Sequence, residues 1–312
     1  MRSSMTLRVA ILGLGKIARD QHVPSIAAVD GVELTAVASR NASLEGVACF
    51  STLDELLARP DLFDAVALCT PPQGRNEQAS AVLSAGKHVL LEKSPGATVS
   101  EVRPLEALAR EKGVALFATW HSRFAPAVEP ARSFLASTTV RSVRIEWKED
   151  VRKWHPGQEW IWEPGGLGVF DPGINALSIL TAILPRPVFL TRSDLSFPEN
   201  RAAPIAASMT FSDGHGVPVE AEFDWRETRG EIWNIMVETD AGSLIVADGG
   251  KRMLVDGALR LDEPDREYAG IYRRFAELAA GGRINVDLSP LQHVADAFLL
   301  GRRHVVEAFV EA

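Results

Sequence analysis

Polar, aromatic and glycine residues are concentrated between Glu149 and Asn175, in the run EDVRKWHPGQEWIWEPGGLGVFDPGIN. The run is too polar and too rich in glycine for a core element, and too aromatic for a solvated linker. Its carboxylates and its histidine can bind hydroxyl groups, and its tryptophans can lie flat against C–H surfaces. We therefore expect a binding site for a small ligand that carries both kinds of surface.

The spacing of three polar residues in this run predicts where their side chains lie. In the alternating segment 143–149, Glu149 falls on the apolar face, where a carboxylate has a partner or a ligand unless the strand twists and leaves it in solvent. Asp171 and Asn175 are four residues apart and share one face if a helix begins there. Asp171 could equally serve only as the N-cap of a helix through Leu184.

The aromatic part of the run begins with Trp154 and His155 and continues with Trp160 and Trp162. Flat rings beside hydrogen-bonding groups suit a sugar, which presents C–H patches and hydroxyls. Each tryptophan could instead serve only core or inter-domain packing. The glycines after Trp162 are expected to let the backbone approach a ligand.

A second chemical feature is a glycine-rich turn near the start of the chain. The apolar run Leu7–Leu12 leads directly into GxGxxA at residues 13–18, and a helical stretch follows. In a strand–turn–helix unit, such glycines let backbone N–H groups approach a pyrophosphate at the helix N-terminus. The motif alone is weak, but its place at the opening of a βαβ unit predicts dinucleotide binding.

The end of the second predicted strand, Glu33–Ser39, bears on which dinucleotide is bound. An NAD-specific site usually carries Asp or Glu there to bind the ribose 2′-hydroxyl. This chain has Ser39-Arg40-Asn41 instead, and a guanidinium beside a hydroxyl suits a 2′-phosphate. We expect NADP to be preferred and NAD to be accommodated, unless Arg40 is only a solvent-exposed strand-end residue.

Lys93 ends the predicted buried strand His88–Leu91, within Glu92-Lys93-Ser94-Pro95. An exposed lysine is ordinarily part of the solvated surface. At a buried strand end beside a cationic nicotinamide ring, desolvation and like charge favour the neutral amine, which can accept a proton.

The first part of the chain has the pattern that would position these residues. Apolar strands alternate with amphipathic helices over residues 6–120, which predicts an α/β domain with a doubly wound parallel sheet. The predicted strand Asp64–Cys69 ends at Thr70-Pro71-Pro72, on the carboxyl edge where such sheets bind ligands. We expect a dinucleotide-binding domain over residues 1–122.

The pattern changes after Phe124. Segments 143–149, 219–225 and 233–237 alternate between apolar and charged residues, which predicts half-buried antiparallel strands with one solvated face. Amphipathic helices at 268–280 and 291–309 complete an α+β domain with a large, open, mostly antiparallel sheet. We expect a substrate-binding domain over residues 123–312, whose C-terminal helix could pack back on the first domain.

Length and charge restrict the class of protein. A chain of 312 residues favours two domains. A net charge of -8 without a Lys/Arg cluster argues against nucleic-acid and membrane partners. Cys49 and Cys69 lie in apolar runs outside any metal-ligand spacing, so we expect buried free thiols and no metal. No secretion signal or membrane span is recognised, which makes the cytoplasm the default location.

Together these motifs resemble the glucose-fructose oxidoreductase/inositol dehydrogenase family, over nearly the whole chain. The matching motifs are Gly13-x-Gly15-x-x-Ala18, Thr70-Pro71-Pro72, Ala85-Gly86-Lys87-His88-Val89, Glu92-Lys93, Arg123-Phe124 and Gly165-Gly166…Asp171-x-Gly173. The resemblance implies an N-terminal Rossmann domain. The run WHPGQEWIWEPGGLGVFDPGIN resembles bacterial 1-dehydrogenases of L-arabinose and D-galactose within that family. It implies oxidation of C1 of an aldopyranose (L-arabinose, D-galactose or D-fucose) to a lactone, with hydride transfer to NAD(P)⁺.

The resemblance also implies residue roles. For catalysis it implies Lys93, Asp171 and Asn175, and around the sugar Glu149, Trp154, His155, Asp171 and Asn175. Around the cofactor it implies Gly13, Gly15, Lys16, Ile17, Ala18, Ser39, Arg40, Thr70, Pro71, Pro72, Glu92, Lys93, His121 and Arg123.

One departure affects the expected mechanism. Many family members carry His four residues after the catalytic Asp, and this chain has Asn175, which cannot act as a base. The stretch from Glu149 to Asn175 then has no evident base of its own. We expect Lys93 to accept the proton of the C1 hydroxyl, oriented by Asp171, with direct action of Asp171 as the alternative.

Two other function classes stay open. A non-catalytic NADP-binding regulator shares this fold, although the presence of both Lys93 and Asp171 favours an enzyme. A family enzyme acting on an inositol or a keto-sugar is the second, which Asn175 and the tryptophan-rich loop disfavour. For assembly we expect a monomer or a weak homodimer, because the open sheet face is charged. That face carries Arg144, Glu146, Lys148, Glu220, Glu222, Asp224 and Glu238.

Overall fold

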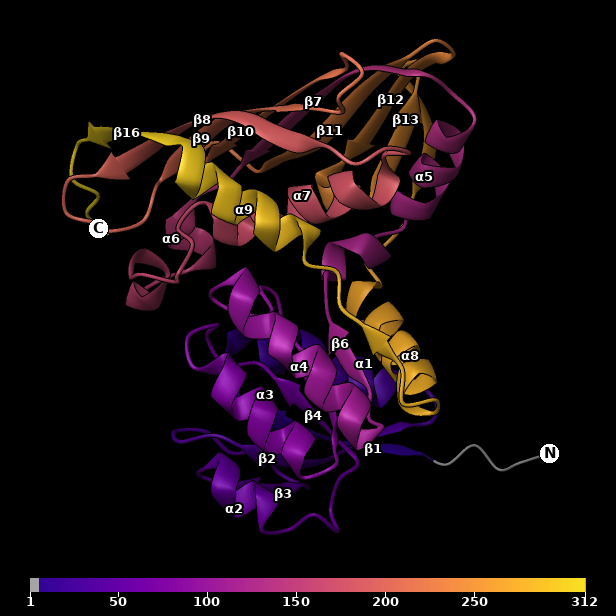
Figure 1. The fold of residues 1–312 in the computed structure, drawn as a ribbon, viewed down its shortest axis with the longest axis vertical. Coiled ribbons are helices and arrows are strands. Elements are labelled where there is room, and N and C mark those ends of the chain that lie inside the picture. The colour runs from indigo at the N-terminus through magenta and orange to yellow at the C-terminus, as the bar shows by residue number, and fades with distance from the viewer. Residues whose placement is uncertain (1–5, 312) are drawn as a thin grey trace. The chain divides into compact units, whose positions relative to one another are not determined.

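The computed structural model describes residues 6–311, which form two compact units (Figure 1). The first unit runs to His121 and resumes at Tyr268–Asp287. The second comprises Ser122–Glu267 and the chain from Leu288 onward. The helix expected at 268–280 therefore packs with the first unit and not, as expected, with the second.

The sheet of the first unit is parallel throughout its described strands, in the order β15-β6-β5-β4-β1-β2-β3. Its strands are β1 (Leu7–Leu12), β2 (Val32–Ala38), β3 (Ala48–Phe50), β4 (Ala65–Leu68), β5 (His88–Leu91), β6 (Leu116–Ala118) and β15 (Ile284–Asn285). The strand order reverses between β1 and β4, which confirms the predicted doubly wound sheet. The strands β3 and β15 were not predicted, because runs of three and two residues show no periodicity.

Helices connect these strands, and Figure 1 shows α3 and α4 side by side. The helices are a π-helical turn (Ala18–His22), α1 (Val23–Ala28), α2 (Leu53–Leu57), α3 (Arg75–Ser84), α4 (Val99–Lys112) and α8 (Glu267–Ala279). The start of α4 has a direct cause. Thr98 and Glu101 form a capping box there, and Gly113 ends the helix with a φ of 66°.

The second unit has a sheet of nine described strands in the order β14-β13-β12-β11-β7-β10-β9-β8-β16. They are β7 (Val140–Lys148), β8 (Phe189–Pro198), β9 (Ala206–Ser212), β10 (Pro218–Asp224), β11 (Ile232–Thr239), β12 (Gly242–Ala247), β13 (Arg252–Val255), β14 (Ala258–Asp262) and β16 (Gly301–Val306). Most neighbours are antiparallel, as predicted, but β7 and β10 are parallel. The long crossover between these two strands, which contains α7, permits that direction.

Helices cover one face of this sheet, where α7 and α9 lie against each other and against the strands (Figure 1). The helices of this unit are α5 (Val128–Ala136), α6 (Val151–Trp154), α7 (Phe170–Ile183) and α9 (Ser289–Leu300), with 3₁₀ turns at His121–Phe124, Glu159–Trp162 and Asp248–Gly250. A Cβ on Gly173 would lie 2.3 Å from the Phe223 ring on β10, so this glycine lets α7 approach the sheet closely.

The opposite face of the sheet carries the charges that the alternation predicted. Arg144 pairs with Glu146 at 3.0 Å, and Lys148 pairs with Glu222 at 3.0 Å. The first pair lies along β7 and the second joins β7 to β10, and together they satisfy a solvated face without a covering layer.

The helix predicted over 291–309 is wrong in its second half. It ends at Leu300, and Gly301–Val306 form β16, paired in parallel with β8. Gly301 has an extended conformation, and a Cβ there would lie 2.7 Å from Leu195 Cδ1. The close approach to β8 explains why the chain leaves the helix at a glycine.

Candidate active site

The glycine turn of the first unit has the geometry of a phosphate-binding loop. Gly13 has a φ of 92°, and a Cβ there would lie 3.0 Å from the backbone nitrogen of Thr70. A Cβ on Gly15 would meet nothing within 4 Å, so that backbone is open to a ligand. A helical turn starts at Ala18, which is buried. These residues fit a pyrophosphate, as the sequence predicts.

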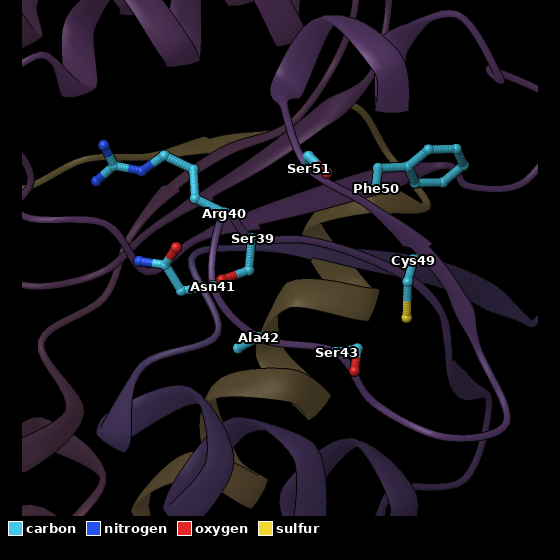
Figure 2. Close-up of a pocket in the computed structure, with 8 residues that line it drawn as sticks. All are labelled: Ser39, Arg40, Asn41, Ala42, Ser43, Cys49, Phe50 and Ser51. Carbon is cyan, nitrogen blue, oxygen red and sulfur yellow. The ribbon is translucent and has the colours of Figure 1, made fainter.

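A pocket of about 310 Å³ lies between the ends of β2 and β3 (Figure 2). Ser39, Arg40 and Asn41 line it from the end of β2, and none of its lining residues, all within the described chain, is acidic. A guanidinium among hydroxyls fits a 2′-phosphate. Cys49 also lines the pocket and is exposed, and Cys69 is half-buried, so the expectation of buried thiols is wrong for both.

The loops after β4 and β5 are tied together by one buried guanidinium. Arg75, at the start of α3, donates to the backbone carbonyls of Thr70, Glu92 and Ser94. Lys93 lies between two of these carbonyls and is half-buried. The strand-end residues expected around the cofactor are therefore held as one rigid edge.

Glu92 is buried, and its carboxylate is bound by groups of its own unit. It accepts from the Lys93 backbone N–H at 2.7 Å and from the Tyr268 hydroxyl at 2.8 Å, and it lies 3.1 Å from His22 Nε2. His121 stacks on Tyr268 with ring centroids 5.5 Å apart. The expected places of Glu92 and His121 around the cofactor stay predictions.

In the second unit, Glu149 has two indole partners. The Nε1–H groups of Trp225 and Trp233 donate to its two carboxylate oxygens at 3.2 and 2.9 Å. The side chain is only 4% exposed. The expectation that this carboxylate has a partner is confirmed, and the alternative of a solvated Glu149 is wrong.

His155 and Asp171 form a pair. His155 Nε2 lies 3.2 Å from Asp171 Oδ2, and His155 Nδ1 lies 3.3 Å from Gln158 Oε1. Asp171 is 5% exposed and lies in the first turn of α7, whose N-cap is Val169. The reading of Asp171 as only an N-cap is therefore wrong. A buried carboxylate oriented by an imidazole can accept a proton, so this geometry is compatible with the alternative of Asp171 as the base, and the choice between Lys93 and Asp171 stays a prediction.

The other expected sugar ligands lie close to this pair. His155 packs against Trp225 with ring centroids 5.4 Å apart. Trp154 is 37% exposed, and its ring centroid lies 5.7 Å from that of Trp233. Asn175 is half-buried one turn after Asp171 on α7. Glu149, Trp154, His155 and Asp171 are thus joined through Trp225 and Trp233.

Several residues of the stretch have packing roles. Trp162 is 3% exposed and packs against Trp225 and Phe309. A Cβ on Gly166 would lie 2.0 Å from the Trp160 carbonyl oxygen, and a Cβ on Gly168 would lie 2.4 Å from that of Pro204. These two glycines bring the backbone close to protein atoms, and the expected approach to a ligand stays a prediction. Trp162 therefore has a core-packing role, which was the alternative to contact with a sugar.

Arg123 was expected around the cofactor. In the structure its guanidinium is hydrogen-bonded to α7. Its Nε donates to the Ser178 carbonyl at 2.9 Å and its Nη2 to the Thr181 hydroxyl at 2.8 Å. The guanidinium therefore fixes the chain that enters the second unit onto α7. Its role at the cofactor stays a prediction.

Sequence reasoning missed four residues of these networks: His22, Arg75, Trp225 and Trp233. Trp225 and Trp233 were placed on strands, but their pairing with Glu149 depends on which strands are neighbours. His22 and Arg75 stand in helices at spacings that carry no signal. Within residues 6–311, no group of three or more His, Cys, Asp or Glu is placed to hold a metal ion, and no helix is long and apolar enough to cross a membrane.

The first unit combines a doubly wound sheet, an open glycine turn and Lys93 on a strand end whose backbone is held by Arg75. This combination is typical of nicotinamide-dependent oxidoreductases. The sequence model of the oxidoreductase family with an NAD-binding Rossmann fold matches residues 7–119. The chain belongs to the glucose-fructose oxidoreductase/inositol dehydrogenase family, which confirms the resemblance. It is therefore an oxidoreductase with an NAD(P)-binding domain.

Relatives match the whole chain. Galactose 1-dehydrogenase of Pseudomonas fluorescens is 46% identical over 305 residues, which cover 98% of this chain and 99% of that protein. The crystal structure of D-galactose-1-dehydrogenase from Rhizobium etli has a TM-score of 0.95 and 57% identity, and covers 99% of this chain and 100% of that one. KijD10, a 3-ketoreductase from Actinomadura kijaniata in complex with NADP and TDP-benzene, has a TM-score of 0.83 at 19% identity, covers 96% and 99%, and shows the fold alone.

Proposed function

We propose that this protein oxidises C1 of an aldopyranose to the aldonolactone and transfers the hydride to NAD(P)⁺. The observation that carries the proposal is the cluster of the buried Glu149 and Asp171 with the half-buried His155, beside the exposed Trp154. It offers hydrogen-bonding groups beside an aromatic face, the combination that a pyranose requires. The full-length similarity to two galactose 1-dehydrogenases supports D-galactose as a substrate.

L-Arabinose and D-fucose belong to the same proposal. The three sugars share the arrangement of ring hydroxyls and differ in the group at C5. A carboxylate held by two indole donors has a fixed orientation, so it selects hydroxyl positions more than the size of the C5 group.

The proton of the C1 hydroxyl has two proposed acceptors. The bound nicotinamide supplies the hydride acceptor. Lys93, whose backbone is held at the carboxyl edge of the first sheet, is the proposed base. Asp171, oriented by His155, is the second candidate within the substrate unit. Either group would contribute about 10²–10⁴-fold to the rate.

NADP is the proposed cofactor, with NAD accommodated. The support is the pocket lined by Ser39, Arg40 and Asn41, in which a 2′-phosphate would find a guanidinium and hydroxyls but no carboxylate among the described lining residues. A cytoplasmic location is part of the proposal, because the free thiols Cys49 and Cys69 suit a reducing compartment. The charged open sheet face favours a monomer or a weak homodimer.

The test is reduction of NADP⁺ and of NAD⁺, followed by nicotinamide absorbance, with L-arabinose, D-galactose, D-fucose, D-xylose, D-glucose and myo-inositol. Turnover of the first three sugars above the others is the expected result. Turnover of myo-inositol alone would contradict the proposal and indicate an inositol dehydrogenase of the same family. Tight NADP⁺ binding without turnover of any sugar would contradict the proposed activity and favour a non-catalytic, cofactor-dependent regulator.

A further inference from the structure

Four side chains form a buried polar cluster in the first unit: His22, Glu92, Tyr268 and Tyr272. His22 Nδ1 lies 2.7 Å from the Tyr272 hydroxyl, and His22 Nε2 lies 3.1 Å from Glu92 Oε1. Tyr268 donates to the same Glu92 oxygen at 2.8 Å. The two tyrosines are the only ones in the chain, and both lie on α8. The cluster joins the helical turn after the glycine loop, the end of β5 and α8.

The electrostatics of the cluster favour a charged pair. Burial raises the pKa of the Glu92 carboxyl, but hydrogen bonding and charge from His22, with smaller contributions from His121 and Tyr268, bring this pKa to about 2. Burial lowers the pKa of His22, but the facing groups Cys69, Tyr272 and Glu92 leave it well above the ordinary value. A carboxylate that is charged and fully buried makes strong hydrogen bonds to its donors.

One of those donors is the backbone of Lys93. Glu92 Oε2 accepts from the Lys93 N–H at 2.7 Å, while Oε1 is held by His22 and Tyr268. The carbonyls on either side of Lys93, those of Glu92 and Ser94, accept from Arg75. The backbone that presents the Lys93 amine is therefore held on its N–H side by the cluster and on its carbonyl side by Arg75.

We propose that His22 and Tyr272 are positioning residues that act through Glu92 to hold Lys93 for proton transfer. His22 belongs to the helical turn that follows the glycine loop, so the same contacts join the phosphate-binding loop to the lysine. The inference rests on the proposed function of Lys93 as the base.

A positioning role differs from a purely structural one in what it changes. Loss of packing alone would lower the stability of the folded protein and leave kcat of the folded fraction intact. Loss of positioning moves the amine, and a displacement of about 1 Å costs about 10²-fold in rate. The affinity for the sugar, bound by other side chains, would change little in either case.

The test uses two variants of the full chain. Tyr272→Phe removes one hydroxyl and keeps the ring, so it folds even if a harsher change does not. His22→Gln keeps an amide in place of the ring and loses the positive charge. We expect kcat with D-galactose to fall about 10-fold in the first and about 100-fold in the second, with KM for the sugar and Kd for NADP⁺ within about twofold of wild type.

His88→Gln is the matched control. His88 stands at the other end of β5 and accepts from the Ala115 N–H at 2.9 Å, so this change also disturbs a hydrogen bond of a half-buried histidine in the same strand. Its kcat should equal that of wild type. An equal loss of kcat in the control and in His22→Gln would overturn the proposal.

Hydrogen exchange of the Lys93 amide gives a readout that needs no turnover. Exchange there should become at least about 10-fold faster in His22→Gln, with no change at Val89 and Leu90. Unchanged exchange at Lys93 overturns the proposal, and so does faster exchange with wild-type kcat. If wild type turns over no sugar, the proposed function fails, and the exchange rates alone then decide whether the cluster holds the lysine.

Discussion

His155 and Asp171 are paired at 3.2 Å between Nε2 and Oδ2, although they are sixteen positions apart, with a 3₁₀ turn and three glycines of positive φ between them. The pair connects the loop after α6 with the first turn of α7. Asp171 is buried, so its charge requires a partner, and the imidazole supplies one. The orientation of the carboxylate at the proposed C1 position is therefore set by His155.

Asp171→Asn removes the carboxylate and keeps its shape. If Asp171 takes part in proton transfer, kcat should fall about 10²–10⁴-fold with a smaller change in KM for the sugar. Steady-state kinetics with D-galactose measure both. Asp194→Asn is the matched control, because Asp194 also pairs with a histidine, His304, at 2.9 Å on the exposed edge of the same unit. A wild-type kcat in Asp171→Asn would remove this residue from the chemistry.

Lys93→Ala tests the proposed base. The variant should lose about 10²–10⁴-fold in kcat and still bind NADP⁺ measurably, because the backbone bonds of Glu92 and Arg75 do not involve the Lys93 side chain. Lys93→Arg keeps a positive charge without an amine that can accept a proton. If Lys93→Arg restores turnover, the lysine acts by charge alone and Asp171 becomes the base.

The fold was predictable where local signals agree with packing. Thr98 and Gly113 mark the ends of α4 by capping, and the alternation over 143–149 reports a sheet with one buried face. The parallel pairing of β7 with β10 was not predictable, because alternation is the same in both directions. The strand β16 was missed because its sequence GRRHVV shows no alternation of apolar and polar residues.

The candidate site was predictable in its residue types but not in its pairings. Glu149 was expected to need a partner, yet its two indole donors come from strands far along the chain. His155 was assigned to the sugar, and its contact with Asp171 follows only from the course of the intervening loop. Contacts between distant segments depend on tertiary packing, which periodicity does not encode.

Arg40→Ala tests the cofactor pocket. Loss of the guanidinium should raise KM for NADP⁺ about 10-fold or more, since charge-assisted bonds to phosphate contribute about 1.5–3 kcal/mol. KM for NAD⁺ should stay within about twofold, because NAD⁺ has no 2′-phosphate. Arg59→Ala, an exposed arginine of the same unit paired with Asp61, is the control. Equal effects on both cofactors would contradict a 2′-phosphate site.

Glu149→Gln changes a carboxylate between two donors into an amide. One indole N–H would then face the amide NH₂, so a buried donor loses its acceptor and stability falls by about 1–3 kcal/mol. Urea unfolding measures that loss. If Glu149 also contacts the sugar, KM for D-galactose rises while kcat changes less. A variant that loses stability but keeps a wild-type KM would leave Glu149 with the structural role alone.

The His22–Glu92 pair should give the stability of the protein a defined pH window. The folded-state pKa of Glu92 is about 2, below its ordinary 4.5, so its contribution is present above 4.5 and is lost as pH falls toward 2. The pKa of His22 is raised above 6.5, so its contribution is present below 6.5 and is lost as pH rises through the folded value. The pair should therefore stabilise most between about 4.5 and 6.5.

Urea unfolding of wild type, His22→Gln and Glu92→Gln across this range measures the effect. The difference between wild type and Glu92→Gln should shrink by on the order of 3 kcal/mol as the pH falls from about 5 to about 2, since one pKa unit is 1.36 kcal/mol. Taking differences removes the exposed carboxylates that also titrate there. A difference that stays constant with pH would mean that Glu92 is neutral in the folded protein, and the charged pair with His22 would then not exist.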